Sequence, residues 1–112
     1  MNTHPIRLAA AIACLLTGGQ ALADGHTDEA LRRANQAAQA KGDATAIQEH
    51  TEAALRHIDA AKQAGQPDHD KLMHLLQGEK NLKEALEHAK QFNTPSANEE
   101  ARDGAHHLEQ AR

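Results

Sequence analysis

The fold is decided by the stretch His50-Thr51-Glu52-Ala53-Ala54-Leu55-Arg56-His57-Ile58-Asp59-Ala60-Ala61-Lys62. Small and apolar residues recur in it and just before it at four-three spacing: Ile47, Thr51, Ala54, Ile58 and Ala61. This spacing is typical of an amphipathic helix whose narrow face packs against other helices. His50 and His57 lie seven residues apart, so both fall on nearly the same side of that helix, beside the packed face.

Looser copies of this stretch occur along the rest of the chain. Ala85-Leu86-Glu87-His88 repeats Ala54-Leu55-Arg56-His57, with Asn81 at the position of His50. An earlier copy is Ala30-Leu31-Arg32-Arg33, in which His26 takes the first histidine position and Arg33 the second. The repeated unit is helical, rich in small residues and dotted with histidine, and no stretch alternates with the period of a strand. The sequence therefore predicts an all-α fold.

Gly and Pro divide residues 24–112 into segments of helix length. We expect helices over residues 28–41, 44–64 and 68–92, and a fourth from the Ser96 region to Ala111. The expected N-terminal caps are Thr27, a Thr45–Gln48 capping box and a Ser96–Glu99 capping box. Four amphipathic helices with short connections favour an antiparallel up-down-up-down four-helix bundle in a single domain.

Residues 1–23 have the pattern of a secretory signal peptide. A weakly positive start to Arg7 is followed by an apolar run over residues 8–16 and by Ala21-Leu22-Ala23, a small-residue cleavage site. The run is too short to span a bilayer, so we expect no stable membrane insertion after cleavage. A lipoprotein interpretation of Ala11-Ile12-Ala13-Cys14 is the alternative. The expected mature chain is a periplasmic domain over residues 24–112, without cysteine and thus without disulfides.

The composition excludes several classes of function. The net charge is −4, and Phe92 is the only residue of the Phe, Tyr and Trp kind, so a basic surface interleaved with aromatic residues is absent and nucleic-acid binding is not expected. Ser96 is the only serine, which argues against nucleophilic catalysis, and we expect a non-enzymatic monomer. A core built mainly from alanine implies close approach of the helices and marginal stability.

Histidine is the residue type that carries chemistry here. The chain has nine histidines, and all but His4 follow the signal segment. Neutral imidazole is the commonest protein ligand for transition metals. Because His50 and His57 are about 10.5 Å apart along a helix, each must find its co-ligand on a neighbouring helix. We expect His57 to lie level with His74, and His106 and His107 to lie near Leu82. The candidate metal ligands are Asp24, His26, His50, His57, His69, His74, His88, His106 and His107.

Carboxylates four residues before a histidine provide a further possibility. Such pairs occur at Asp70 and His74, at Glu84 and His88, and at Asp103 and His107. The carboxylate can chelate together with the ring or can orient it. Their number is only a mild excess over chance.

Cleavage after Ala23 would create a different kind of site. Asp24-Gly25-His26 would then be a free N-terminus with histidine in third place. The terminal amine, two deprotonated amides and the imidazole can enclose one ion in a square plane, a geometry that selects Cu(II) or Ni(II). If His26 only precedes the Thr27 cap, or if cleavage shifts by one residue, this site does not form.

The exported, cysteine-free, histidine- and alanine-rich repeat resembles the small metal-binding protein family of periplasmic four-helix bundles. The residues that carry the resemblance are 50–62 and 81–90, with fainter matches at 26–37 and 107–111. The resemblance implies reversible binding of divalent transition metals, Cu(II) foremost, by surface and inter-helix histidines. Arg33 and Asn81 depart from the pattern, because they stand where the repeat would carry histidine.

Two alternative functions compete with a periplasmic protein that buffers or scavenges Cu(II), and also Ni(II) or Zn(II). One is a non-catalytic structural or chaperone-like helical bundle of the cell envelope, which an exposed patch of leucines would favour. The other is a haem-binding bundle with Met73 and a histidine as axial ligands, which the lack of aromatic residues disfavours. Histidines gathered at matching heights on neighbouring helices would favour the metal-binding function.

Overall fold

A computed structural model describes residues 19–65 and 67–112 of the chain, and all the elements found there are helices. They are α2 (Gly19–Gln39), α3 (Ala44–Ala64), α4 (His69–Lys90) and α5 (Thr94–Gln110). The predicted all-α class is confirmed. The predicted signal peptide lies largely outside the described residues. No helix in the described part of the chain combines the length and the apolar character that a membrane span needs.

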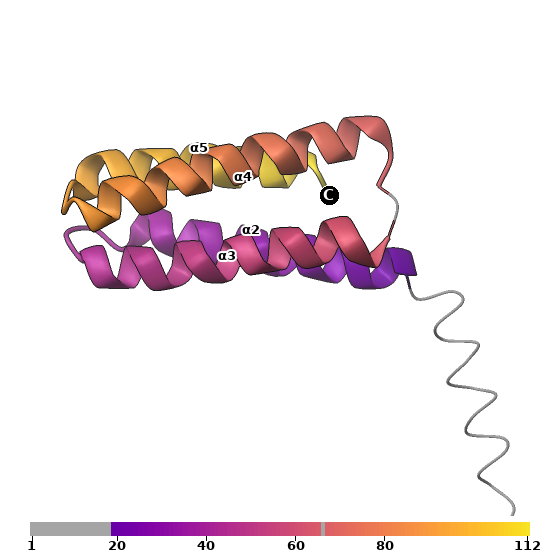
Figure 1. Cartoon of the computed structure of the whole chain (residues 1–112), viewed down its shortest axis with the longest axis horizontal. Helices are drawn as coiled ribbons and strands as arrows, with labels where there is room; N and C mark the ends of the chain where they lie inside the picture. Colours follow the sequence, from indigo (N-terminus) through magenta and orange to yellow (C-terminus); the bar gives the residue numbers. More distant parts are fainter. Residues whose placement is uncertain (1–18, 66) are drawn as a thin grey trace, which may run out of the picture.

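The helices form an up-down-up-down bundle of two hairpins. The α2–α3 and α4–α5 turns lie at one end of the bundle and the α3–α4 connection lies at the other (Figure 1). The most extensive contacts are between α2 and α3 and between α4 and α5, and the hairpins meet through α2 with α5 and α3 with α4. The antiparallel four-helix bundle expected from the repeats is therefore confirmed.

Alanine dominates the core. The residues predicted to form the packed face of α3 are buried, including Ala54 and Ile58, and Ala34 of α2 is buried too, each with no exposed surface. The largest side chains in the core are few: Ile47, Ile58, Leu82 and Leu108. Because an alanine core contributes little apolar area per residue, its stability depends on close packing of the helices.

Polar contacts support the packing between hairpins. Nδ2 of buried Asn98 on α5 donates to the carbonyl of Ala37 on α2 at 2.9 Å, which satisfies an acceptor near the end of that helix. Lys62 of α3 lies 3.0 Å from Glu79 of α4, and this contact raises the pKa of Lys62.

The starts of α3 and α5 differ from prediction. The N-caps of α3, α4 and α5 are Asp43, Asp68 and Asn93, and each side-chain oxygen accepts from the backbone N–H three residues on. The capping boxes predicted at Thr45 and Ser96 are therefore wrong. In both cases the Asx residue precedes the hydroxyl residue by two or three positions and takes the cap first, in line with the strong Asx preference for this position.

The first helix starts earlier than predicted. Asp24, Gly25 and His26 lie within α2 instead of before it. Thr27 is not an N-cap, because its Oγ1 donates to the carbonyl of Ala23 at 2.9 Å within the helix. A threonine hydroxyl can donate to the carbonyl one turn back, and the residue then fits inside a helix. Sequence spacing does not distinguish such an interior threonine from a threonine N-cap.

The α4–α5 turn also differs from prediction. The predicted helix ran to Phe92, but α4 ends at Lys90, and Phe92 adopts a φ of 60°. The N–H of Asn93 donates to the carbonyl of His88 at 2.8 Å, and that of Phe92 donates to Ala89. These bonds and the left-handed residue form a Schellman-type ending in a position usually taken by glycine.

Two glycines set the distance between α4 and α5. A Cβ on Gly78 would lie 3.1 Å from Leu108, and one on Gly104 would lie 3.0 Å from Leu82. Gly78 is therefore a site of close contact between the two helices.

Replacing Gly104 by leucine should therefore overpack this contact. We expect Gly104→Leu to lower the free energy of unfolding by about 1–3 kcal/mol in urea denaturation. The control is Arg102→Leu, which places the same side chain at an exposed position of the same helix and should change it by about 0.5 kcal/mol or less. Equal effects of the two substitutions would contradict the assigned contact.

Candidate metal-binding site

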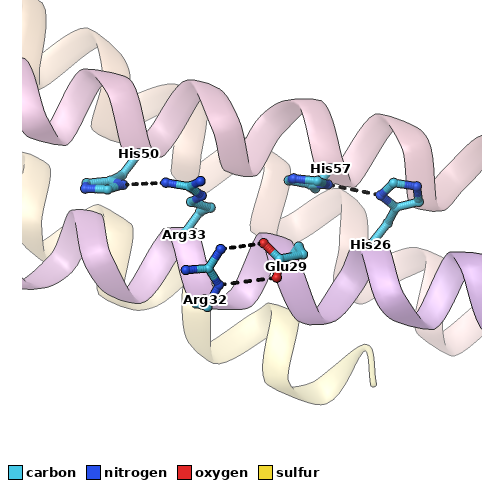
Figure 2. A network of polar contacts seen from close by, with 6 residues as sticks. All are labelled: His26, Glu29, Arg32, Arg33, His50 and His57. Atoms are coloured by element: carbon cyan, nitrogen blue, oxygen red, sulfur yellow. Dashed lines mark hydrogen bonds and ion pairs between the residues drawn. The ribbon is translucent and has the colours of Figure 1, made fainter.

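Side chains at one heptad position face one another across each hairpin. In the first hairpin, His26 of α2 faces His57 of α3, and Arg33 faces His50 one heptad further along (Figure 2). Because the helices are antiparallel, seven residues forward on α2 correspond to seven residues back on α3. Adjacent contacts of this kind are about 10.5 Å apart, so each is a separate site.

The second hairpin repeats this arrangement. His74 of α4 stacks on His107 of α5, with ring centroids 6.1 Å apart and an angle of 24° between the planes. One heptad further along α4, Nδ2 of Asn81 donates to Oε1 of Glu100 at 3.2 Å. The two hairpins thus each contain one pair of histidines. We call His26 and His57 the first histidine pair, and His74 and His107 the second.

The first histidine pair already brings two potential metal donors together. The Nδ1 atoms of His26 and His57 are 3.0 Å apart, so one ring donates its N–H to the lone pair of the other. Transfer of that proton to Nε2 of the same ring leaves two neutral imidazoles, each with a lone pair on Nδ1 facing the other ring. Both residues are half-buried, which limits how far the rings can move apart.

The second histidine pair contains two ring nitrogens without a hydrogen-bond partner among the described residues. The Nδ1 atoms of His74 and His107 are both buried and have no hydrogen-bond partner among the described residues. An unsatisfied buried polar atom costs about 1–3 kcal/mol, and a ligand that engages both atoms would recover this. These atoms belong to neighbouring rings on two helices, with centroids 6.1 Å apart.

The charged groups around the first histidine pair shift the pKa of His57 in opposite directions. The pKa of His57 is lowered, first by burial and then by the like charge that His26 would carry. Glu29 lies on α2 between His26 and Arg33, but Arg32 holds its carboxylate through bonds of 2.7 and 3.3 Å (Figure 2). The guanidinium lowers the pKa of Glu29, which stays charged beside the pair.

The remaining sequence-predicted ligands are not drawn into cross-helix histidine pairs. His69 and His106 are exposed, and Nε2 of His106 accepts from the amide of Gln110 at 3.2 Å. His88 lines a cavity of about 230 Å³ together with Ser96, Glu99, Glu100 and Asp103. The side chain of Asp24 is exposed on α2. The three predicted carboxylate–histidine pairs form no ion pair or hydrogen bond in the described part of the chain.

The pairing of histidines differs from the prediction. His57 was expected to lie level with His74 across α3 and α4, but its partner is His26 across α2 and α3. His107 was expected near Leu82, but Gly104 occupies that level and His107 reaches His74. The heptad repeat on α2 and α5, followed through an antiparallel register, was the sequence signal that identifies the correct partners.

These features define a class: an all-α bundle in which neighbouring helices present paired imidazoles. The model of the small metal-binding protein family matches residues 1–111, and the chain belongs to that family. Comparison with curated protein sequences and with solved structures gave no match.

The lowered pKa of His57 predicts a pH dependence for the metal-free protein. The unfolded chain takes up this proton near pH 6.5, the ordinary value, whereas the folded chain takes it up only at lower pH. The unfolded state therefore binds more protons in this range, and the free energy of unfolding falls as the pH drops from about 6.5 towards the folded pKa.

Urea denaturation from neutral pH to about pH 5 tests this dependence. We expect His57→Gln to flatten it, because glutamine does not titrate. The exposed-site control, His106→Gln, should retain the wild-type dependence. A wild-type stability that rises on acidification through this range would contradict the assignment.

Proposed function

We propose that this protein binds divalent transition metal ions, Cu(II) foremost and also Ni(II) and Zn(II), through the two histidine pairs. The observation that carries the proposal is the 3.0 Å separation of two imidazole nitrogens from neighbouring helices. The unsatisfied Nδ1 atoms of the second pair support the same function.

The two rings of the first histidine pair point at each other. Their Nδ1 atoms are 3.0 Å apart and their centroids are 5.2 Å apart, which is the head-on arrangement of a hydrogen bond. An ion shared by both nitrogens would replace the proton between them, and the two rings would turn towards the ion. Among the divalent ions, Cu(II) leads the general affinity order for such ligands, with Ni(II) and Zn(II) below it.

The number of ligands favours reversible binding. In the described part of the chain, no group of three or more histidine, cysteine or carboxylate side chains is assembled for a metal. Each pair therefore supplies two protein ligands and leaves the other positions to water or to an exchanging partner. Closed structural sites use four protein ligands, so these sites suit buffering or scavenging of metal by a non-enzymatic protein.

The surface gives the chaperone-like alternative little support. Large exposed apolar side chains are spread over the start of α2, the first half of α4 and the α4–α5 turn: Leu22, Met73, Leu76 and Phe92. A binding surface for unfolded chains would be expected to form a contiguous apolar patch.

The proposed location is the periplasm, with cleavage after Ala23. Cleavage would make Asp24, Gly25 and His26 part of the first turn of the shortened α2, where backbone N–H groups have no partner one turn back. The amides needed for a square-planar N-terminal site would then be available. His26 would be shared between this site and the first histidine pair.

Calorimetric titration of the mature protein with Cu(II) tests the pairs. We expect His26→Gln with His57→Gln, and His74→Gln with His107→Gln, each to remove at least one equivalent of bound metal. The matched control is His69→Gln with His106→Gln, which removes two exposed imidazoles and should retain both pair sites. Binding to the pairs should weaken below about pH 6, because ligation requires neutral imidazole. Unchanged stoichiometry in both pair variants would contradict the proposal.

A second titration separates the two uses of His26. Replacing His57 alone should abolish the first pair and leave a tight square-planar N-terminal Cu(II) site with its visible d–d absorption. Replacing His26 alone should abolish both. If the two single variants behave alike, the N-terminal site does not form.

A further inference from the structure

Arg33 stands at a position of α2 where the repeated sequence would carry a histidine, and it makes one of the contacts between α2 and α3 that recur every seven residues. The contact between Arg33 and His50 is one heptad from the first histidine pair and lies between the same two helices (Figure 2). Nη1 of Arg33 lies 3.3 Å from Nδ1 of His50, close to the 3.0 Å that separates the nitrogens of the pair. A histidine at position 33 would thus face His50 in the register in which His26 faces His57.

The chemistry of this contact opposes metal binding. A guanidinium has donors only, so Nδ1 of His50 accepts the hydrogen bond and its lone pair is engaged. The guanidinium also keeps its charge at every physiological pH. A divalent ion placed on Nδ1 would have to displace this group and would be repelled by it.

Arg33 has no ion-pair partner that would account for its position. Among the described residues no carboxylate lies within ion-pair distance of it, since Glu29 is held by Arg32. Its Nε is buried without a hydrogen-bond partner in the same part of the chain. A cation held against a neutral ring with one unsatisfied N–H contributes little to stability. Its clearest effect is on His50.

We propose that Arg33 blocks a third histidine site: by holding Nδ1 of His50, it restricts the first hairpin to one divalent ion and keeps this nitrogen out of the metal-binding set. This inference rests on the proposed function and adds the determinant of how many ions the hairpin takes. Arg33 acts through His50 and is a positioning residue.

Substitution at position 33 tests the proposal by a gain of binding. Arg33→His should add one equivalent of Zn(II) or Cu(II) in calorimetry. Its affinity should exceed that of the single imidazole left by Arg33→Gln by roughly 10²–10⁴-fold, because a second imidazole on the neighbouring helix acts at high effective concentration. The matched control, Arg33→His with His50→Ala, should lose this equivalent.

The wild-type chain supplies a test that needs no new site. With Zn(II) added up to saturation of the histidine pairs, the NMR signals of the His26 and His57 rings should shift while those of His50 stay in place. The ¹⁵N shifts of His50 should report an unprotonated Nδ1 and a protonated Nε2 before and after the titration.

The outcomes separate this inference from the proposed function. Arg33→His without an added equivalent, or a wild-type His50 that shifts with Zn(II), would overturn the role of Arg33. Neither result affects the losses expected when the histidine pairs themselves are removed. If those losses are absent and Arg33→His still gains an equivalent, the proposed function fails while the block at His50 stands.

Discussion

Close antiparallel packing through small residues is the constraint on which the histidine contacts depend. Ala34 and Ala54, one on each helix of the first hairpin, are fully buried, and Gly78 and Gly104 lie at close contacts between the helices of the second. Larger residues there would separate the helices and place facing imidazoles out of reach. The alanine-rich core buries little apolar area, but the close helix packing that it allows also brings Nδ1 of His26 to 3.0 Å from Nδ1 of His57.

The helical repeat made the fold predictable, and local detail was less so. Apolar spacing around Ile58 and the breaks near Gly42 and Pro95 identify the helices, because burial of one face decides them. Cap residues were harder to assign. Asp43 and Thr45 are both residue types that cap helices, and each would accept from a different backbone N–H, so spacing alone does not choose between them.

The site was predictable as a set of residues and not as a set of pairs. The abundance of histidine and its heptad spacing follow from the sequence, whereas partners depend on the register between helices, which turn length and core packing set together. The sequence alone led to the prediction that His57 pairs with His74. The structure pairs each histidine within its own hairpin, where the contacts between helices are most extensive. On the proposed function, one ion would link the two helices of one hairpin, and the hairpins would take up metal separately.

The central claim is that imidazoles from two neighbouring helices share one ion. Pulsed electron paramagnetic resonance of the His26→Gln variant with one equivalent of Cu(II) tests it most directly, since this variant lacks both the first histidine pair and the N-terminal site. The account predicts modulation from two equatorial imidazoles, reduced to one when His74 is also replaced. Coordination by a single imidazole, or a signal that is unchanged by loss of His74, would contradict it.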